Sequence, residues 1–178
     1  MKNFYLLIAC VACAMFVSCS GSSSEETTPT KTITPTSNEF MRGQLARYIE
    51  IAADASDAEF DYIEKDGAIP SQYLRLKVTL EKVKSGFEDV DPRDIKFSYW
   101  GGHLATIDLV DENGTKIQSI RMRSDETLKF QKLITGPVHS KAEIVFEEEF
   151  HNSEAAPKWF ESITQFTPYA TADIATNF

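Results

Sequence analysis

Carboxylates are the most abundant side chains of this sequence that could do chemistry, with 27 Asp and Glu among 178 residues. Two carboxyl groups at a suitable separation can hydrolyse glycosides, and several around one point can bind calcium. Glu147, Glu148 and Glu149 fall in a segment that we expect to be a strand, where successive side chains point to opposite faces. Adjacent members therefore cannot converge. A carboxylate-based hydrolase using Glu147 or Glu149 is kept as the enzymatic alternative.

A second group of acidic residues, Asp89, Asp91 and Asp94, lies in the turn-rich stretch "EDVDPRD". Carboxylates in a loop can surround a hard cation, so calcium binding stays open here. The spacing of an EF-hand loop is absent, however. We expect these three side chains to form part of a solvated acidic surface.

Other catalytic and metal-binding patterns are missing from the sequence. The three histidines do not have the spacing that places two imidazoles on one metal ion; they are His103, His139 and His151. No G-x-S-x-G elbow and no glycine-rich phosphate loop occur. We therefore expect no metal, no cofactor and no enzymatic activity.

The aromatic pair Tyr99 and Trp100 is the best candidate for contact with a ligand such as a glycan. It precedes Gly101 and Gly102, which we expect to form a turn at the end of a strand. Aromatic rings offer a large contact area at low entropic cost. Both rings could equally belong to the core or its rim.

The N-terminus has the features of an export signal. Lys2 precedes an uncharged apolar run, Phe4 to Val17, of 14 residues. A helix needs about 20 apolar residues to cross a bilayer, and no later stretch is comparably apolar. We therefore expect residues 1–18 to be removed on export and the mature chain to have no membrane-spanning helix.

The segment Phe16-Val17-Ser18-Cys19 resembles the lipobox of bacterial lipoproteins, apart from Phe16, which stands where Leu is most common. The resemblance implies cleavage before Cys19 and attachment of acyl chains to its thiol. Several acyl chains together anchor a protein stably, at about 0.8 kcal/mol per buried CH₂. The other two cysteines, Cys10 and Cys13, lie in the discarded signal. We expect a protein anchored to the outer membrane, on the cell surface or on the periplasmic face.

Residues 20–38 are rich in Ser, Thr and Pro, with Ile33 as the one clearly aliphatic side chain. Such a composition cannot bury enough apolar surface to fold, which predicts a flexible tether for residues 19–38. Similar lipoproteins of some Gram-negative bacteria carry acidic or serine-rich residues after the cysteine as a signal for surface display. Glu25 and Glu26 are in keeping with that role.

Residues 39–178 have the length and composition of one domain. The clearest pattern is "YLRLKVTLEKV", in which apolar and polar residues alternate as in a half-buried strand. Shorter alternations predict further strands, about eight in all. These involve Leu45, Ile49, Ile51, Phe60, Tyr62, Ile95, Phe97, Tyr99, Leu128, Phe130, Ile144, Phe146 and Phe150.

The strongest local signal is a hairpin with Asn113-Gly114 at its turn. These two residues can supply the positive φ angles of a two-residue type I′ turn. Such a turn would place Ile107 opposite Ile120, Val110 opposite Ile117, and Asp111 opposite Lys116 as an ion pair.

The pattern predicts an all-β fold, an antiparallel β-sandwich with one short helix near the C-terminus. That helix would start at Asn152 or Ser153 and place three apolar side chains on one face: Trp159, Phe160 and Ile163. The pieces resemble the small immunoglobulin-like domains of bacterial lipoproteins.

The charge of the chain restricts its partners. Removal of residues 1–18, in which Lys2 is the one charged side chain, changes the net charge from -9 to -10. An acidic surface repels nucleic acid and anionic headgroups. We expect a non-catalytic binding or structural module that contacts a glycan, an envelope protein or a host protein. The alternatives are the hydrolase and a fimbrial or assembly subunit that adds a strand to a partner sheet.

Overall fold

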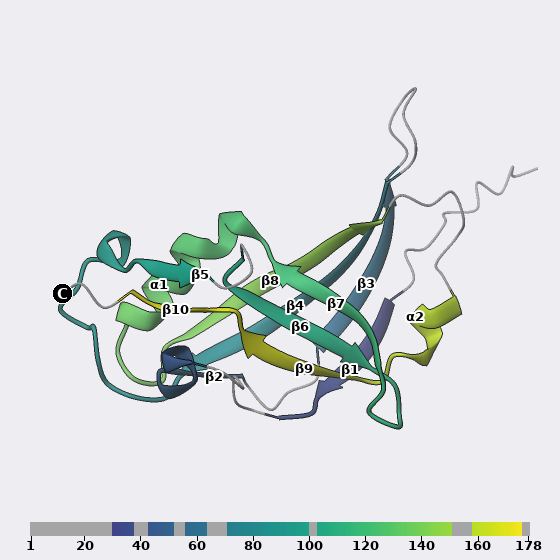
Figure 1. Cartoon of the computed structure of the whole chain (residues 1–178), viewed down its shortest axis with the longest axis horizontal. Coiled ribbons are helices and arrows are strands. Elements are labelled where there is room, and N and C mark those ends of the chain that lie inside the picture. The colour runs from purple at the N-terminus through teal and green to yellow at the C-terminus, as the bar shows by residue number, and fades with distance from the viewer. Residues whose placement is uncertain are drawn as a thin grey trace, which may run out of the picture.

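The computed structural model of the chain (Figure 1) describes residues 30–37, 43–51, 56–63, 71–99, 103–150 and 158–175. Ten strands are described: β1 (Thr30–Pro35), β2 (Ile49–Ile51), β3 (Ser56–Ile63), β4 (Ser71–Lys82), β5 (Phe97–Tyr99), β6 (Ala105–Val110), β7 (Lys116–Met122), β8 (Lys141–Phe150), β9 (Gln165–Ala170) and β10 (Ala172–Ile174). The helices are α1 (Thr127–Thr135), α2 (Lys158–Ser162) and three short 3-10 turns, η1 (Gln44–Arg47), η2 (Pro92–Asp94) and η3 (Ser124–Glu126). The prediction of a predominantly β fold is confirmed.

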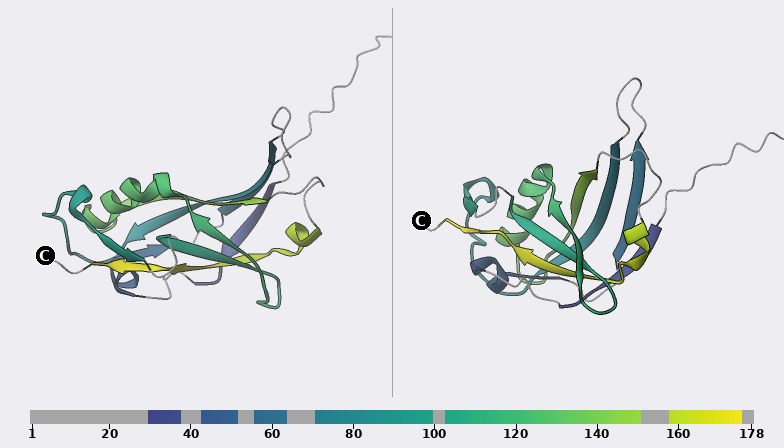
Figure 2. Two further views of the ribbon diagram at one scale, coloured as in Figure 1. Left: turned by 45° about the horizontal axis from the view of Figure 1, so that its top comes forward. Right: turned by 45° about the vertical axis from the view of Figure 1, so that its right-hand side comes forward.

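Eight of these strands form one sheet with the order β2-β4-β3-β1-β9-β6-β7-β8. An additional pairing joins β8, the last strand of this order, to β4, the second, so the sheet curls into a barrel-like body (Figures 1 and 2). All pairings in it are antiparallel except that of β1 with β9. Strands β5 and β10 pair in a separate small sheet.

The β-sandwich that we predicted is not confirmed, because the main sheet closes on itself and does not form two stacked layers. The longest seam of this sheet joins β4 to β8 in a continuous register from Gln72 opposite Phe150 to Glu81 opposite Lys141. The alternation predicted for β4 is confirmed. Its inward side chains are fully buried and line the core: Leu74, Leu76, Val78 and Leu80.

Apolar side chains from every strand of the barrel fill its interior. Ile33, Ile107, Ile120, Phe146 and Phe166 all belong to one buried cluster that also includes residues of α1 and α2. Among the described residues, the buried polar or charged ones are Lys82, Thr106, Glu126 and Thr135. The interior is therefore a packed core.

Strand β1 lies inside the segment 19–38 that we predicted to be a tether. It pairs with β3 from Thr30 opposite Glu59 to Ile33 opposite Ser56, and with β9 on its other side. The side chain of Ile33 is fully buried. One apolar residue among Thr, Lys and Pro is enough here, because the alternate side chains of a half-buried strand face water. The folded body thus begins by Thr30 and not at Glu39.

The predicted hairpin exists as β6 and β7, with Ile107 opposite Ile120 as expected. Its loop, however, has three residues, Glu112 to Gly114, closed by a hydrogen bond from the Asp111 N–H to the Thr115 carbonyl at 3.0 Å. Only Gly114 has positive φ, +75°. This is the three-residue loop with a bulge at a left-handed residue. A separate irregularity shifts the register between Leu109 and Val110, where the pairing skips Ile117 of β7. Val110 therefore pairs with Lys116, and the predicted pairs of Val110 with Ile117 and Asp111 with Lys116 are wrong.

Leu128 and Phe130, which we predicted to lie on a strand, belong to helix α1. Phe130, Leu133 and Ile134 are buried on one face of α1, while Leu128 is 38% exposed. The spacing of the three buried residues is that of a helix face. The short helix predicted near the C-terminus corresponds to α2, with Phe160 and Ile163 buried. Its predicted start, Asn152 or Ser153, lies outside the described residues.

Candidate functional site

The residues that the sequence singled out most strongly cannot be placed. Cys19, Trp100, Gly101 and Gly102 lie outside the described residues, as does His151. Tyr99 ends β5, where its backbone pairs with Ala172 of β10. The described residues do, however, form several clusters of polar side chains.

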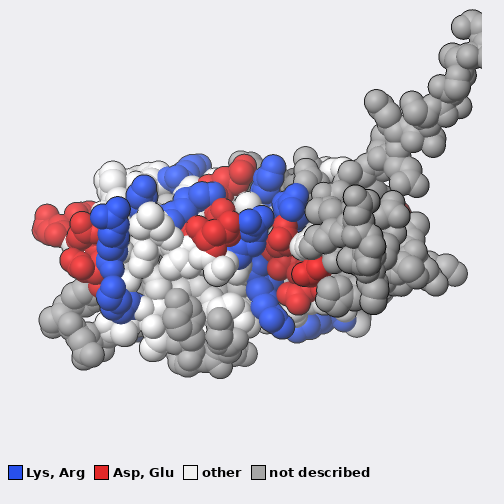
Figure 3. All heavy atoms as spheres, turned by 90° about the horizontal axis from the view of Figure 1, so that it is seen from above, with Lys and Arg blue, Asp and Glu red and all other residues white. Residues whose placement is uncertain are grey.

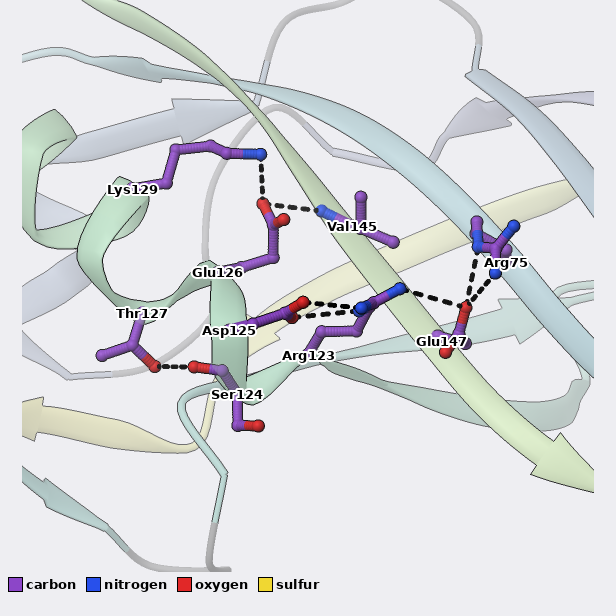
Figure 4. Close-up of polar contacts among 9 residues, drawn as sticks. All are labelled: Arg75, Arg123, Ser124, Asp125, Glu126, Thr127, Lys129, Val145 and Glu147. Carbon is purple, nitrogen blue, oxygen red and sulfur yellow. Dashed lines mark hydrogen bonds and ion pairs between the residues drawn. The ribbon is translucent and has the colours of Figure 1, made fainter.

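The first cluster lies on the outer face of β4 and β8, around Glu147 (Figure 4). Glu147 Oε2 accepts a hydrogen bond from Arg75 Nε at 2.7 Å and lies 2.6 Å from Arg75 Nη2. Arg123, which follows β7, approaches the same oxygen at 3.6 Å and also pairs with Asp125 at 2.6 Å. The pairing with Asp125, followed by the charge of Glu147, raises the pKa of Arg123. This carboxylate is thus held between two guanidinium groups.

The same cluster continues to the start of α1 through Glu126 (Figure 4). This buried side chain accepts from Lys129 Nζ at 2.6 Å and from the Val145 N–H at 3.4 Å. It therefore ties the helix to β8. Across the face seen in Figure 3, Lys and Arg lie among Asp and Glu, so this surface is a mixture of charges rather than a patch of one sign.

As expected, neighbouring glutamates of β8 do not share a partner in these contacts. Glu148 pairs with Arg121 at 3.6 Å, whereas Glu147 pairs with Arg75 and Arg123. The cluster joins β4, β7 and β8 by ion pairs. Its adjacent glutamates Glu147 and Glu148 have different partners in these contacts.

The second cluster surrounds Lys82 at the opposite end of β4 from Ser71. Its ammonium group is completely buried and donates to the Gly86 carbonyl at 2.7 Å, to Glu88 Oε1 at 2.8 Å and to the Gly136 carbonyl at 2.6 Å. An ammonium group has three protons, so its donor capacity is used in full. We call this arrangement the Lys82 clasp. It fastens the loop after β4 and the end of α1 to the barrel.

The loop held by the Lys82 clasp borders a surface hollow of about 540 Å³, lined by Ser85, Gly86, Phe87, Glu88, Asp89 and Val90. Phe87 has a φ of +66°, a left-handed conformation that is costly for a bulky residue. Its ring packs edge-on against Tyr48, with centroids 5.1 Å apart. The Gly86 N–H donates to both oxygens of Glu88, at 2.9 and 2.7 Å. The hydrogen bond from Lys82, more than any other contact, lowers the pKa of Glu88.

The three aspartates considered for calcium lie beside this loop but do not converge. Asp89 lines the hollow, and Asp91 accepts from the Arg93 N–H at 2.8 Å as the N-cap of η2, which ends at Asp94. Within the described ranges, no three His, Cys, Asp or Glu side chains are grouped to hold a metal ion.

A third cluster, which the sequence did not reveal, surrounds Asp108 on the outer face of β6. Its Oδ1 accepts from Ser119 Oγ at 2.5 Å, Lys116 Nζ at 2.9 Å and Tyr169 Oη at 3.2 Å. The contact with Asp108 raises the pKa of Lys116. Lys116 therefore pairs with Asp108, not with Asp111 as predicted. The four residues come from three adjacent strands and stabilise the sheet.

Comparison with protein family models, with curated proteins and with solved structures finds no match. In the part of the chain that the structure describes, no helix has the length and apolar character needed to cross a bilayer.

Proposed function

We propose that this chain is a bacterial lipoprotein whose folded body is a non-catalytic binding or structural module displayed at the outer membrane. Acyl chains on Cys19 would hold it to the bilayer, since its acidic surface repels anionic headgroups. The observation that carries the non-catalytic part is the saturation of its polar clusters. The charged side chains of each cluster bind one another, and the barrel interior is filled by apolar side chains.

Mass spectrometry of the native protein tests the anchor. We expect cleavage before Cys19 and a mass increase that corresponds to acyl chains on that residue. The matched variant is Cys19→Ala, which has no thiol to alkylate and should therefore lack this mass increase. A native protein with a bare thiol or with residues 1–18 still attached would contradict the proposal.

If the partner is a glycan, Tyr99 and Trp100 are the proposed contacts. The chain has two tryptophans, so the substitution Trp159→Phe leaves Trp100 as the sole indole emitter. A shift of its fluorescence with one glycan of a broad panel would support this contact. An unchanged spectrum with the whole panel would remove it.

A second candidate is an assembly subunit that pairs with a strand of its partner. It is favoured by the narrow seam between β7 and β8, which is limited to Arg121 opposite Glu147 and Met122 opposite Phe146 in the described residues. A partner strand could add along the remainder of β7. Sedimentation of the folded body should then reveal polymers that grow with concentration, whereas a monomer at all concentrations would exclude this role.

The proposed relationship to immunoglobulin-like domains also stays a prediction.

A further inference from the structure

The position of β1 limits how far the folded body can lie from its proposed anchor. Cys19 and Thr30 are 11 residues apart in the sequence. Such a segment reaches at most about 40 Å when fully extended. A coil of that many residues has a root-mean-square length of about 18 Å. The body is therefore held nearer to the bilayer than the predicted 19-residue tether would place it.

The direction of β1 decides which end of the barrel is nearer. Thr30 pairs with Glu59, and the antiparallel register runs from there to Ile33 opposite Ser56. The N-terminal end of β1 therefore lies toward the end of the barrel where β3 finishes, at Ile63. Helix α2 lies at this same end, where Lys31 Nζ donates to the Glu161 carbonyl. The turn between β6 and β7 is also there, as both views of Figure 2 agree.

The Lys82 clasp lies at the other end. Glu59 pairs with Arg75, so Thr30 is level with Arg75, and β4 continues from there to Lys82. Seven residues of strand span about 23 Å. The loop Ser85–Val90 lies beyond that point. To bring this loop to the bilayer, the 11-residue segment would have to span more than those ~23 Å. This exceeds the ~18 Å of a coil of that length, and the stretching costs chain entropy.

We propose that the barrel stands on the membrane with the end that carries Thr30 and α2 toward the bilayer. The end that carries the Lys82 clasp and its hollow is then displayed outward. The inference rests on the proposed acylation of Cys19.

Single cysteine probes can measure this orientation, because the chain has no cysteine after Cys19. Glu112→Cys marks the turn between β6 and β7, and Asp89→Cys marks the loop at the Lys82 clasp. Both positions are exposed, and both substitutions remove one negative charge. Each full-length acylated variant is labelled with the same donor dye. It is then bound to phosphatidylcholine vesicles whose headgroups carry an acceptor dye.

We expect efficient energy transfer from position 112 and a clear loss of transfer from position 89. Equal transfer from both, or stronger transfer from position 89, would overturn the orientation while vesicle binding still supports the anchor. Failure of the unsubstituted acylated protein to float with vesicles would overturn the anchor and the orientation together. Insertion of ten Gly and Ser residues after Ser24 should reduce the difference between the two probes, because it lengthens the tether.

Discussion

Lys82 illustrates how one buried side chain can hold several segments of the barrel together. It continues the inward face of β4 after four fully buried aliphatic residues, and its charge is satisfied by two carbonyls and one carboxylate. A buried cation is tolerated only when it is paired and hydrogen-bonded in this way. The clasp is therefore a structural device.

Replacement of Lys82 by Met should destabilise the protein strongly. The substitution keeps the volume of the side chain but leaves the carbonyls of Gly86 and Gly136 without their donor. Each buried acceptor left unsatisfied costs about 1 to 3 kcal/mol. Urea denaturation measures the change, and the exposed residue Lys84, replaced in the same way, serves as the control. Equal stabilities of the two variants would contradict the structural role of the clasp.

Glu88 should make the stability of the clasp depend on pH. Its pKa is lowered in the folded protein, first by the hydrogen bond from Lys82. A carboxylate of this kind adds stability above its unfolded pKa, and that stability is lost as the pH falls through the lower folded pKa. In thermal melts at decreasing pH, the wild type should therefore lose its advantage over Glu88→Gln. A difference that does not change with pH would refute this coupling.

The sequence did not reveal the Lys82 clasp, for a physical reason. Lys82 resembles any polar residue at the end of an alternating strand. Two of its partners are backbone carbonyls, and that of Gly136 is 54 residues away. Glu147 was different, because the alternation of β8 correctly separated it from Glu148. Local periodicity determines the face of a residue but not its distant partners.

At the scale of elements, α1 shows how a short window misleads. Leu128 and Phe130 alternate as on a strand, but the buried set Phe130, Leu133 and Ile134 has helical spacing. A longer window would have found that signal. Strand β4 was predicted correctly because its apolar and polar residues alternate over many positions. No helical spacing of apolar residues competes with that alternation.

The two faces of α1 give a direct test of this assignment. Phe130→Ala removes a fully buried ring, which typically costs about 3 to 5 kcal/mol. Leu128→Ala changes an exposed side chain and should stay within about 0.5 kcal/mol of the wild type. Chemical denaturation of both variants measures the difference. On a strand the two residues would share a face, so equal losses would contradict the helix.

The loop between β6 and β7 depends on one glycine. Gly114 has a φ of +75°, and a Cβ added there would meet nothing within 4 Å. The cost of Gly114→Ala is therefore purely conformational, about 1 to 2 kcal/mol for a left-handed residue. Gly114→Asn should cost less, because Asn tolerates this conformation. If Ala and Asn proved equally mild in thermal denaturation, the left-handed loop would be wrong.

At the scale of the whole molecule, the sequence misplaced the start of the folded body. The prediction that residues 20–38 form a tether used composition alone. Composition does not show that alternate residues of a strand face water and can therefore be polar. We expect a chain that begins at Thr30 to fold and one that begins at Glu39 to lose the ordered barrel, since β3 and β9 then have no strand between them. Amide hydrogen exchange of β3 and β9 distinguishes the two. Strong protection in the shorter chain would contradict a role for β1.

Ile33→Ala is a milder version of the same test. The residue is fully buried, and an Ile-to-Ala change in a core costs about 2 to 5 kcal/mol. The control is Thr30→Ala, an exposed position on the same strand. Guanidinium denaturation should reveal a large loss for the first variant and almost none for the second.

The neighbours of β1 also determine the order of events during biogenesis. Thr36 at the end of β1 contacts Thr167 of β9, across 131 residues of chain. Pairings that distant form slowly, because a long loop must close before any contact is gained. Synthesis must pass β9 before the ring of strands can be completed. Under the proposed acylation of Cys19, a chain exported from its N-terminus would be acylated while its barrel is still open and β3 and β9 are not yet joined by β1.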